Sequence, residues 1–402
     1  MQKIGGKQKT VRNINLRCVF ELLQDKDRSG VELAKLTGLS ATSISKITRG
    51  LLQKGVLQKG EVLPLGNGRF PTKLKINPDA GYVIAIDFSV VQIHIIAADI
   101  LGKKLKEFFV PHEKEITRQN IEAAVEAVKD IMQAVGYPKN ALLCICIAVP
   151  GKFDKETYDF IYSPRFKNYR EINIYQIFKQ NFDAHIIIKN DMKIFLAAER
   201  AYGVLKNDRS DTFFLFIDEG TGSAFCYNDI ITEGANGFTG EIGLMITNPL
   251  NSDTADPDLY NNARYFNDVF CTTALAESFR RKLMEKRDTG FNIKGNAICF
   301  SDIADNFKTG NAFCAAEIKS YSLALASFVG SIAELMDFNN IIISGMITEL
   351  GDGLIALLQE YLNKRPSRLR VHVKFGNLTQ NAKILGCVSE AVKVGLETLF
   401  LN

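Results

Sequence analysis

The chain has 402 residues, of which 46% are hydrophobic and 23% are charged, a composition typical of a globular protein with two or three domains. No apolar run reaches the about 18 residues that a membrane-spanning helix needs. The start, MQKIGGKQKT, lacks the apolar core of a secretory signal. We therefore expect a cytoplasmic protein that has no membrane partner.

The net charge of +4 hides an uneven distribution along the chain. Residues 1–77 hold 15 Lys and Arg against 5 Asp and Glu, so the remaining residues, 78–402, are net acidic. Neutralisation of phosphates supplies most of the non-specific affinity of proteins for DNA. A small basic segment joined to a larger acidic body therefore indicates a DNA-binding head on a sensing or catalytic domain.

The first 77 residues have the pattern of a winged helix-turn-helix. Helical spacing over 12–23 predicts a first helix, and further helices are expected at 30–36 and about 41–53, the last capped by Ser40. A small residue, Ala34, stands where two helices would cross, and Gly38 permits the left-handed backbone of the turn. Two strands with a Gly-rich tip would follow as a wing.

The third helix is expected to bury Ile44, Ile47 and Leu51 and to present its polar residues to a DNA major groove. The predicted DNA-contacting residues are Thr42, Ser43, Ser45, Lys46 and Arg49. In the wing, the tip sequence GNGR places Arg69 where it could enter a minor groove. The alternatives are an ordinary helical subdomain with a solvated basic face and, for Arg69 alone, a plain turn residue.

From Tyr82 onwards the pattern changes to strands that alternate with helices, and it restarts near Asp211. Each half reads strand, turn, strand, with a Gly or an acid in the turn, and then helices and strands. We predict an α/β body in two lobes, with an α+β winged-helix head before it. The expected domains are 1–77, then 78–204 with the C-terminal helix 383–402 packing back on it, and 205–382.

The eight cysteines are scattered without a CxxC pair, and most lie in apolar stretches such as ALLCICIAV. This distribution indicates reduced, buried thiols and not a disulfide or metal framework. The four histidines are also isolated in sequence and predict no metal ligand set.

Several segments in order along the chain resemble one family. The strand YVIAIDFS, the segment AVPGKFD, the pair Asn190-Asp191, the run EGTGS and the run GANGFTGEIG, behind a winged head, are together similar to the ROK family of repressors, open reading frames and sugar kinases. The resemblance covers essentially the whole chain. It implies a two-lobed actin/hexokinase-like (ribonuclease H-like) domain, which in the kinases phosphorylates hexoses and in the repressors senses a sugar or sugar phosphate.

The resemblance also implies roles for particular residues. Asp191 corresponds to the catalytic base of the kinases, and Asn190 and Glu241 correspond to sugar contacts. A phosphate-binding turn corresponds to Gly220, Thr221 and Gly222, where glycines let backbone N–H groups approach an anion. The alternatives are a helix N-cap for Asp191 and a tight hairpin turn for the glycine run.

Other positions depart from the pattern of the kinases. The first phosphate loop, Asp-x-Gly-x-Thr in the kinases, here starts at Asp87 and continues as Phe88-Ser89-Val90-Val91, and the adenosine-side glycine pair is Ser344-Gly345-Met346. Bulky valines stand where a phosphate would approach. We therefore expect no ATP cofactor and no enzymatic activity.

The zinc-binding pattern of the family is also incomplete. Leu244 stands at the position of the family's histidine, and Cys271 is the one cysteine between Leu244 and Cys299, whereas a structural zinc needs four ligands. The family's Ser-Pro-Asn appears as Ser163-Pro164-Arg165. Arg165 suits an anionic effector such as a phosphosugar, because a guanidinium fork matches phosphate or carboxylate; an ordinary surface arginine is the alternative.

We favour a transcriptional regulator, most simply a repressor of carbohydrate-related genes, that binds an operator in double-stranded DNA and senses a sugar or phosphosugar. A homodimer or homotetramer is expected, because palindromic operators match two-fold proteins. One alternative is an ATP-dependent hexose kinase that uses Asp191 as its base. The other is a regulator without a small-molecule effector.

Overall fold

The structure is a computed structural model, and it describes residues 15–16, 18–62, 72–88, 92–113, 115–247, 263–286, 288–367 and 370–401. The chain divides into two compact units. Unit 1 comprises residues 1–151, 158–189 and 387–402, and unit 2 comprises residues 152–157 and 190–386. Each unit is built around its own five-stranded sheet.

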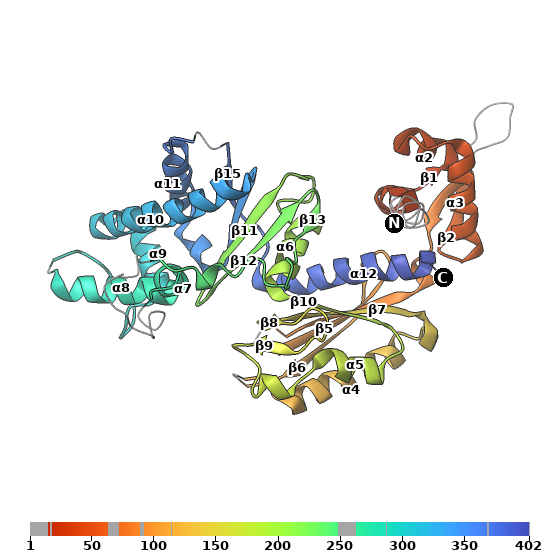
Figure 1. The fold of residues 1–402 in the computed structure, drawn as a ribbon, viewed down its shortest axis with the longest axis horizontal. Coiled ribbons are helices and arrows are strands. Elements are labelled where there is room, and N and C mark those ends of the chain that lie inside the picture. The colour runs from red at the N-terminus through yellow and green to blue at the C-terminus, as the bar shows by residue number, and fades with distance from the viewer. Residues whose placement is uncertain are drawn as a thin grey trace. The chain divides into compact units, whose positions relative to one another are not determined.

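The head, at the start of unit 1, combines helices with a small sheet (Figure 1). A helix through 18–25 precedes α2 (Gly30–Thr37) and α3 (Ala41–Gln53). The sheet has the order β1-β3-β2, in which both pairings are antiparallel. Its strands are β1 (Arg28–Ser29), β2 (Leu57–Val62) and β3 (Thr72–Ile76). The predicted helices and the paired strands of the predicted wing are confirmed.

The large sheet of unit 1 has the order β10-β7-β4-β5-β6. The central strand β4 pairs antiparallel with β5 and parallel with β7. Its strands are β4 (Tyr82–Asp87), β5 (Gln92–Asp99), β6 (Lys104–Pro111), β7 (Leu142–Val149) and β10 (His185–Asn190). Every residue of β4 and β7 is buried, which explains their continuous apolar sequence.

The sheet of unit 2 has the order β13-β12-β11-β14-β15. Its strands are β11 (Thr212–Ile217), β12 (Thr221–Tyr227), β13 (Ile230–Ile231), β14 (Asn340–Ser344) and β15 (His372–Phe375). Here β11 pairs antiparallel with β12 and parallel with β14. In both sheets the first strand lies in the centre, the second and third strands follow on one side, and the last two lie on the other. This repetition confirms the predicted duplication.

Alternate residues of β11 explain why both faces of this sheet are covered. Phe213, Leu215 and Ile217 belong to the large apolar cluster formed with α8 (Thr272–Glu285), α9 (Phe300–Lys308) and α10 (Ala312–Met336). Phe214 and Phe216 face the other way and pack against α6 (Asp191–Ala201). Figure 1 shows α10 and α6 on opposite sides of these strands. The two-residue period of a strand therefore separates two cores.

The remaining helices follow the predicted pattern with small differences. They are α4 (Arg118–Ala134), α5 (Ile174–Asn181), α7 (Asn267–Phe270), α11 (Asp352–Asn363) and α12 (Lys383–Leu401), and two short strands, β8 (Lys152–Phe153) and β9 (Phe160–Tyr162), form a separate pair. Cys271 separates α7 from α8, since it is the C-cap of α7 and the N-cap of α8.

The observed division into units differs from the expected domain boundaries. Helix α6 was expected in the same lobe as β4, but it belongs to unit 2, which starts at Asn190. The physical reason is apolar packing, because Met192, Phe195 and Leu196 bury their side chains against the unit 2 sheet. The C-terminal helix starts in unit 2 and continues in unit 1 from Cys387.

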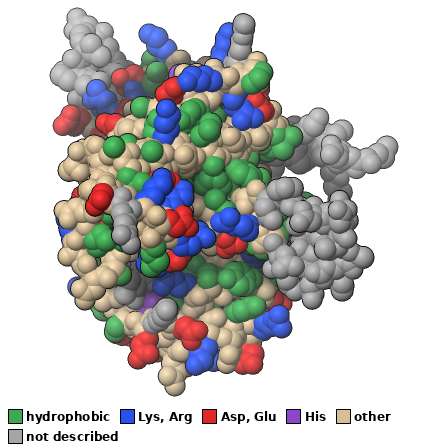
Figure 2. Space-filling view, turned by 90° about the vertical axis from the view of Figure 1, so that its left-hand side faces the viewer, with side chains coloured by type: hydrophobic (Ala, Val, Ile, Leu, Met, Phe, Trp, Pro, Cys, Tyr) green, Lys and Arg blue, Asp and Glu red, His purple; other side chains and the backbone are tan. Residues whose placement is uncertain are grey.

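Helix α10 is long and apolar enough to cross a membrane by length and composition, and it is the one helix among the described residues that meets this test. Its buried residues, including Ile318, Leu325 and Val329, belong to the core of unit 2. On the face shown in Figure 2, basic and acidic side chains are interspersed among apolar ones.

Candidate functional site

Local hydrogen bonds fix the helix-turn-helix of the head. Ser29 and Glu32 form a reciprocal capping box at the start of α2. Gly38 ends α2 with φ +71° and donates its N–H to the Ala34 carbonyl, as the left-handed turn requires. Ser40 then caps α3 by accepting a hydrogen bond from Ser43 N–H. The turn that orients α3 is therefore specified by its own residues.

Helix α3 buries one side and exposes the other. Ile44, Thr48 and Leu51 are buried, whereas the predicted core residue Ile47 is half-buried. Thr48 fits an apolar site because its hydroxyl donates to the Ile44 carbonyl at 2.9 Å. The five predicted DNA-contacting residues of α3 are all exposed, namely Thr42, Ser43, Ser45, Lys46 and Arg49.

The end of α3 contacts the end of the chain. Lys54 Nζ, at the C-cap of α3, donates to the Leu399 carbonyl of α12 at 3.0 Å. The tip of the predicted wing, including Arg69, lies outside the described residues.

In unit 2, Asn190 and Asp191 start helix α6. Asn190 is the N-cap, and its side-chain oxygen accepts a hydrogen bond from Met192 N–H at 2.9 Å. Asp191 is therefore the first helical residue and not the cap, and 8% of its surface is exposed. Its carboxylate is free of a capping role, in a favourable position at the positive end of the helix dipole.

A lysine from the other end of the sequence meets this carboxylate. Lys383 Nζ, on the first residue of α12, lies 3.0 Å from Asp191 Oδ2, and both side chains are buried. The same ammonium lies 5.3 Å from the centroid of the Phe216 ring and 5.9 Å from that of Phe195. The aromatic faces support a cation that has lost most of its water.

Glu241 belongs to the same group of charges. Its Oε2 lies 3.6 Å from Lys152 Nζ. Burial raises the pKa of Glu241 above its usual value, and the negative charge of Asp191 raises it further, while Lys152 and Lys193 oppose this shift. Glu241 is therefore a half-buried carboxylate held close to the Lys152 ammonium.

Lys193 holds the loop that leads to Glu241. Its ammonium, on the inner side of α6, donates to Glu233 Oε2 at 2.8 Å and to the Gly237 carbonyl at 2.8 Å. The Lys193 side chain is 4% exposed. The loop is therefore bound to the same helix that carries Asp191.

A close backbone approach fixes the other end of this loop. Gly240 has φ +101°, and a Cβ at this position would lie 2.2 Å from the Ser223 carbonyl oxygen. Ser223 donates to the Gly240 carbonyl through both its hydroxyl, at 2.8 Å, and its N–H, at 3.2 Å. Glycine is therefore required immediately before Glu241.

The predicted phosphate turn lies in the hairpin between β11 and β12. Ile217 pairs with Thr221, so residues 218–220 form the connection, and Thr221 and Gly222 belong to β12. Thr221 N–H donates to Asn267 Oδ1 at 2.9 Å. Gly222 is needed for packing, because a Cβ there would lie 2.7 Å from Met192 Cγ. Gly220 therefore lies in a tight hairpin connection, and Thr221 and Gly222 lie at the start of the strand that follows it.

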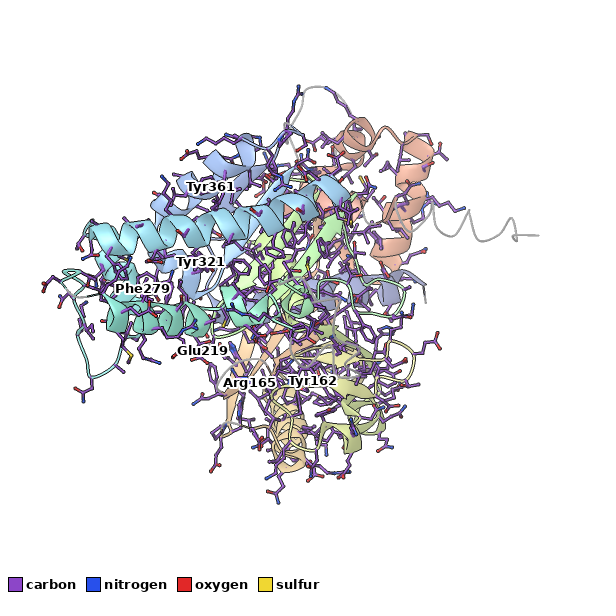
Figure 3. All side chains as sticks on the ribbon, turned by 60° about the vertical axis from the view of Figure 1, so that its left-hand side comes forward. Tyr162, Arg165, Glu219, Phe279, Tyr321 and Tyr361 are labelled. Carbon is purple, nitrogen blue, oxygen red and sulfur yellow. The ribbon has the colours of Figure 1, made fainter. Side chains whose placement is uncertain are left out.

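Arg165 and Asp87 lie in unit 1. The Ser163 hydroxyl donates to the Pro150 carbonyl and accepts from the Arg165 N–H, so it fixes the backbone of this loop. Figure 3 labels Arg165 on this loop. Its guanidinium is half-buried and has no hydrogen-bond or ion-pair partner among the described residues. Asp87 is buried at the end of β4, and the residues after Phe88 in its loop, 89–91, lie outside the described residues.

Leu244 and Cys271 are the residues compared above with the family's zinc-binding pattern. Leu244 is 56% exposed. Cys271 caps α8, because its sulfur accepts a hydrogen bond from Ala274 N–H at 3.3 Å. Within the described ranges, no group of three or more His, Cys, Asp and Glu side chains could hold a metal ion.

Sequence reasoning did not identify the three lysines of this site, Lys152, Lys193 and Lys383. The one available signal was a lysine inside an otherwise apolar helix, as in MKIFLAA and AKILGCV, since a buried lysine needs a partner. That signal does not reveal the partner: Lys383 and Asp191 are 192 residues apart in the chain.

Comparisons of sequence give a consistent set of relatives. Residues 83–393 match the model of the ROK family. The xylose repressor of Caldicellulosiruptor bescii is 24% identical over 396 residues, which cover 96% of this chain and 97% of that protein. The Escherichia coli K12 regulator NagC is 24% identical over 247 residues, or 61% of this chain and 60% of that protein.

Solved structures agree with these relatives in fold. A ROK family transcriptional regulator, described as a homologue of E. coli Mlc, superimposes with a TM-score of 0.80 at 17% identity and covers 98% of this chain and 100% of its own. The ROK hexokinase from Thermus thermophilus superimposes with a TM-score of 0.61 at 16% identity, covering 79% of this chain and 99% of its own.

Proposed function

This chain belongs to the ROK family, and we propose that it is a transcriptional regulator, most simply a repressor, that binds an operator through its basic head and senses a sugar through unit 2. The single observation that carries the proposal is the exposed, basic face of α3 in a capped helix-turn-helix. The full-length similarity to a protein named xylose repressor supports it.

The DNA contacts that we propose are those of α3 and the wing. The hydroxyls of Thr42, Ser43 and Ser45 are short groups near the start of the helix, where they suit phosphates or base edges. Lys46 and Arg49 add positive charge on the same exposed face. Arg69 is retained as a proposed minor-groove contact.

The effector contacts that we propose in unit 2 are Asn190, Asp191 and Glu241. In unit 1, we propose Arg165 separately as a contact for an anionic group of an effector. The two carboxylates suit sugar hydroxyls, which donate hydrogen bonds. The Thr221 N–H already has a partner in Asn267, which favours a turn with a structural role over a nucleotide-phosphate site. We propose a non-enzymatic, cytoplasmic homo-oligomer.

The test of DNA binding uses an operator selected by the full chain from random-sequence duplexes. Fluorescence anisotropy then compares the selected duplex with random DNA at several salt concentrations. The proposal predicts an affinity ratio of at least about 10³ and a steep salt dependence. Equal affinity for both duplexes would reject it.

The kinase alternative is tested separately. ADP release is followed with ATP and a panel of hexoses, and the D191A variant provides the background. We expect no turnover above that background. Sustained Asp191-dependent ADP release would establish the kinase instead.

A further inference from the structure

The buried ion pair between Asp191 and Lys383 includes one of the proposed effector contacts, Asp191. Lysine carries three N–H donors, and Asp191 Oδ2 is the one acceptor for Lys383 Nζ among the described residues. Asp191, in turn, receives no other side-chain or backbone donor within the described part of the chain. A lysine ammonium and a carboxylate can each form hydrogen bonds beyond their own pair, so a ligand group at Asp191 can also meet Lys383.

The surroundings restrict what that group can be. Phe216 and Phe195 flank the ammonium and offer no acceptor oxygen. The pair is neutral as a whole, so a phosphate or carboxylate that approached Lys383 would also meet the negative charge of Asp191. A neutral group that both donates and accepts a hydrogen bond fits both partners, and a sugar hydroxyl is such a group.

We propose that Lys383 is a ligand-contacting residue of the effector site, and that Asp191 and Lys383 together hold one hydroxyl of a sugar. The hydroxyl donates its hydrogen to the Asp191 carboxylate and accepts a hydrogen bond from the Lys383 ammonium. This assignment rests on the proposed function and adds to it a residue that determines which hydroxyl pattern is bound.

The same contact explains why this site favours binding over phosphoryl transfer. In a kinase the hydroxyl oxygen must present a lone pair to phosphorus while a base takes its proton. A hydroxyl that accepts from an ammonium has a lone pair engaged and is a weaker nucleophile. Lys383 therefore favours binding of the sugar over its phosphorylation at Asp191, the residue that corresponds to the catalytic base of the kinases.

The test starts with the full-length protein and a thermal-shift panel of aldopentoses and aldohexoses and their phosphate esters, because a ligand of the folded state raises the melting temperature. The sugar with the largest shift is then titrated by calorimetry into wild type, K383M and K374M. Lys374 forms a second, more exposed Lys–Asp pair in unit 2, with Nζ 3.2 Å from Asp208 Oδ2. K383M should bind about tenfold more weakly or worse, and K374M should bind like wild type.

Monodeoxy analogues of that sugar separate a ligand contact from a structural role. One analogue, which lacks the hydroxyl held by the pair, should bind wild type and K383M with equal affinity, whereas the other analogues should keep the difference. If K383M does not fold, the double variant D191N/K383M, which leaves no unpaired buried charge, is compared with wild type in its place.

The outcomes are distinct. A sugar that binds wild type and K383M equally, or a loss of affinity that is the same for every deoxy analogue, overturns the role of Lys383 and leaves the regulator intact. A panel in which no sugar raises the melting temperature overturns both the sensing function and this assignment.

Discussion

Lys193 and Glu233 form an ion pair with Nζ 2.8 Å from Oε2, and the same ammonium donates to the Gly237 carbonyl. This relationship connects α6, which carries Asp191, to the loop that ends at Glu241. The position of the loop that leads to Glu241 therefore depends on Lys193.

Substitution of Lys193 by Met should release this loop. We expect the free energy of unfolding to fall by about 2 kcal/mol, since hydrogen bonds to a buried charged group are lost. The ligand-induced rise in melting temperature should shrink at the same time. Urea unfolding with and without the sugar measures both effects.

The control is K364M, which removes an exposed pair with Glu360 on α11. Surface pairs within one helix contribute little, so this variant should unfold like wild type. A K193M protein that matches K364M in both stability and ligand response would contradict the role given to Lys193.

Substitution of Gly240 by Ala should be more damaging than its small size suggests. The φ of +101° and the 2.2 Å distance between a new Cβ and the Ser223 oxygen require the backbone to move. We expect a loss of about 2 kcal/mol or more in the free energy of unfolding. In G295A, by contrast, the new methyl group meets no atom within 4 Å, and the effect should be small. Chemical denaturation of both variants decides whether this turn requires glycine.

Glu199 predicts a pH dependence of stability. Its buried carboxylate accepts N–H groups of Val204 and Leu378, each at 3.1 Å, and burial raises its pKa. Because the folded protein binds this proton more tightly than the unfolded chain, the contribution of Glu199 is complete below the unfolded pKa of about 4.3 and is lost as pH rises through the higher folded pKa. The stability of wild type minus that of E199Q should therefore fall as pH rises above the unfolded pKa of about 4.3.

Urea unfolding at a series of pH values measures this difference, and E285Q, at an exposed position on α8, is the matched control. A difference between wild type and E199Q that stays constant or grows with pH would show that burial does not govern this carboxylate.

The exposed cations of α3 should act on DNA through phosphate charge. Lys46→Ala and Arg49→Ala are each expected to lower the slope of log affinity against log salt by about one. K319A, at an exposed position on α10, should leave the slope unchanged. Anisotropy titrations at several salt concentrations provide the slopes. Slopes for the α3 variants equal to that of K319A would place the DNA interface elsewhere.

The sequence predicted most of the fold because its signals are local. Gly38 marks the C-terminus of α2 and Ser40 marks the N-terminus of α3. The buried strands β4 and β7 are continuous apolar runs in the sequence. The boundary at Asn190 was missed because packing decides it, and α6 has no local sequence signal that assigns it to either sheet.

The candidate site was predictable only in part for the same reason. Asp191 and Glu241 lie in recognisable motifs, whereas Lys383 becomes part of the site only when the start of α12 meets the start of α6. A smaller difference concerns α3, where Thr48 is buried although Ile47 was the expected core residue. The Thr48 hydroxyl donates a hydrogen bond within its own helix, so this side chain can pack like an apolar one.

The most direct test of a sugar-responsive repressor is the affinity of the full chain for its selected operator, measured by anisotropy with and without the sugar that stabilises it most. The account predicts that the sugar weakens operator binding by at least about tenfold, a typical allosteric coupling. It also predicts that D191N/K383M, which leaves no unpaired buried charge, binds the operator normally but no longer responds to the sugar. Operator affinity that is the same at every sugar concentration in wild type would contradict the account.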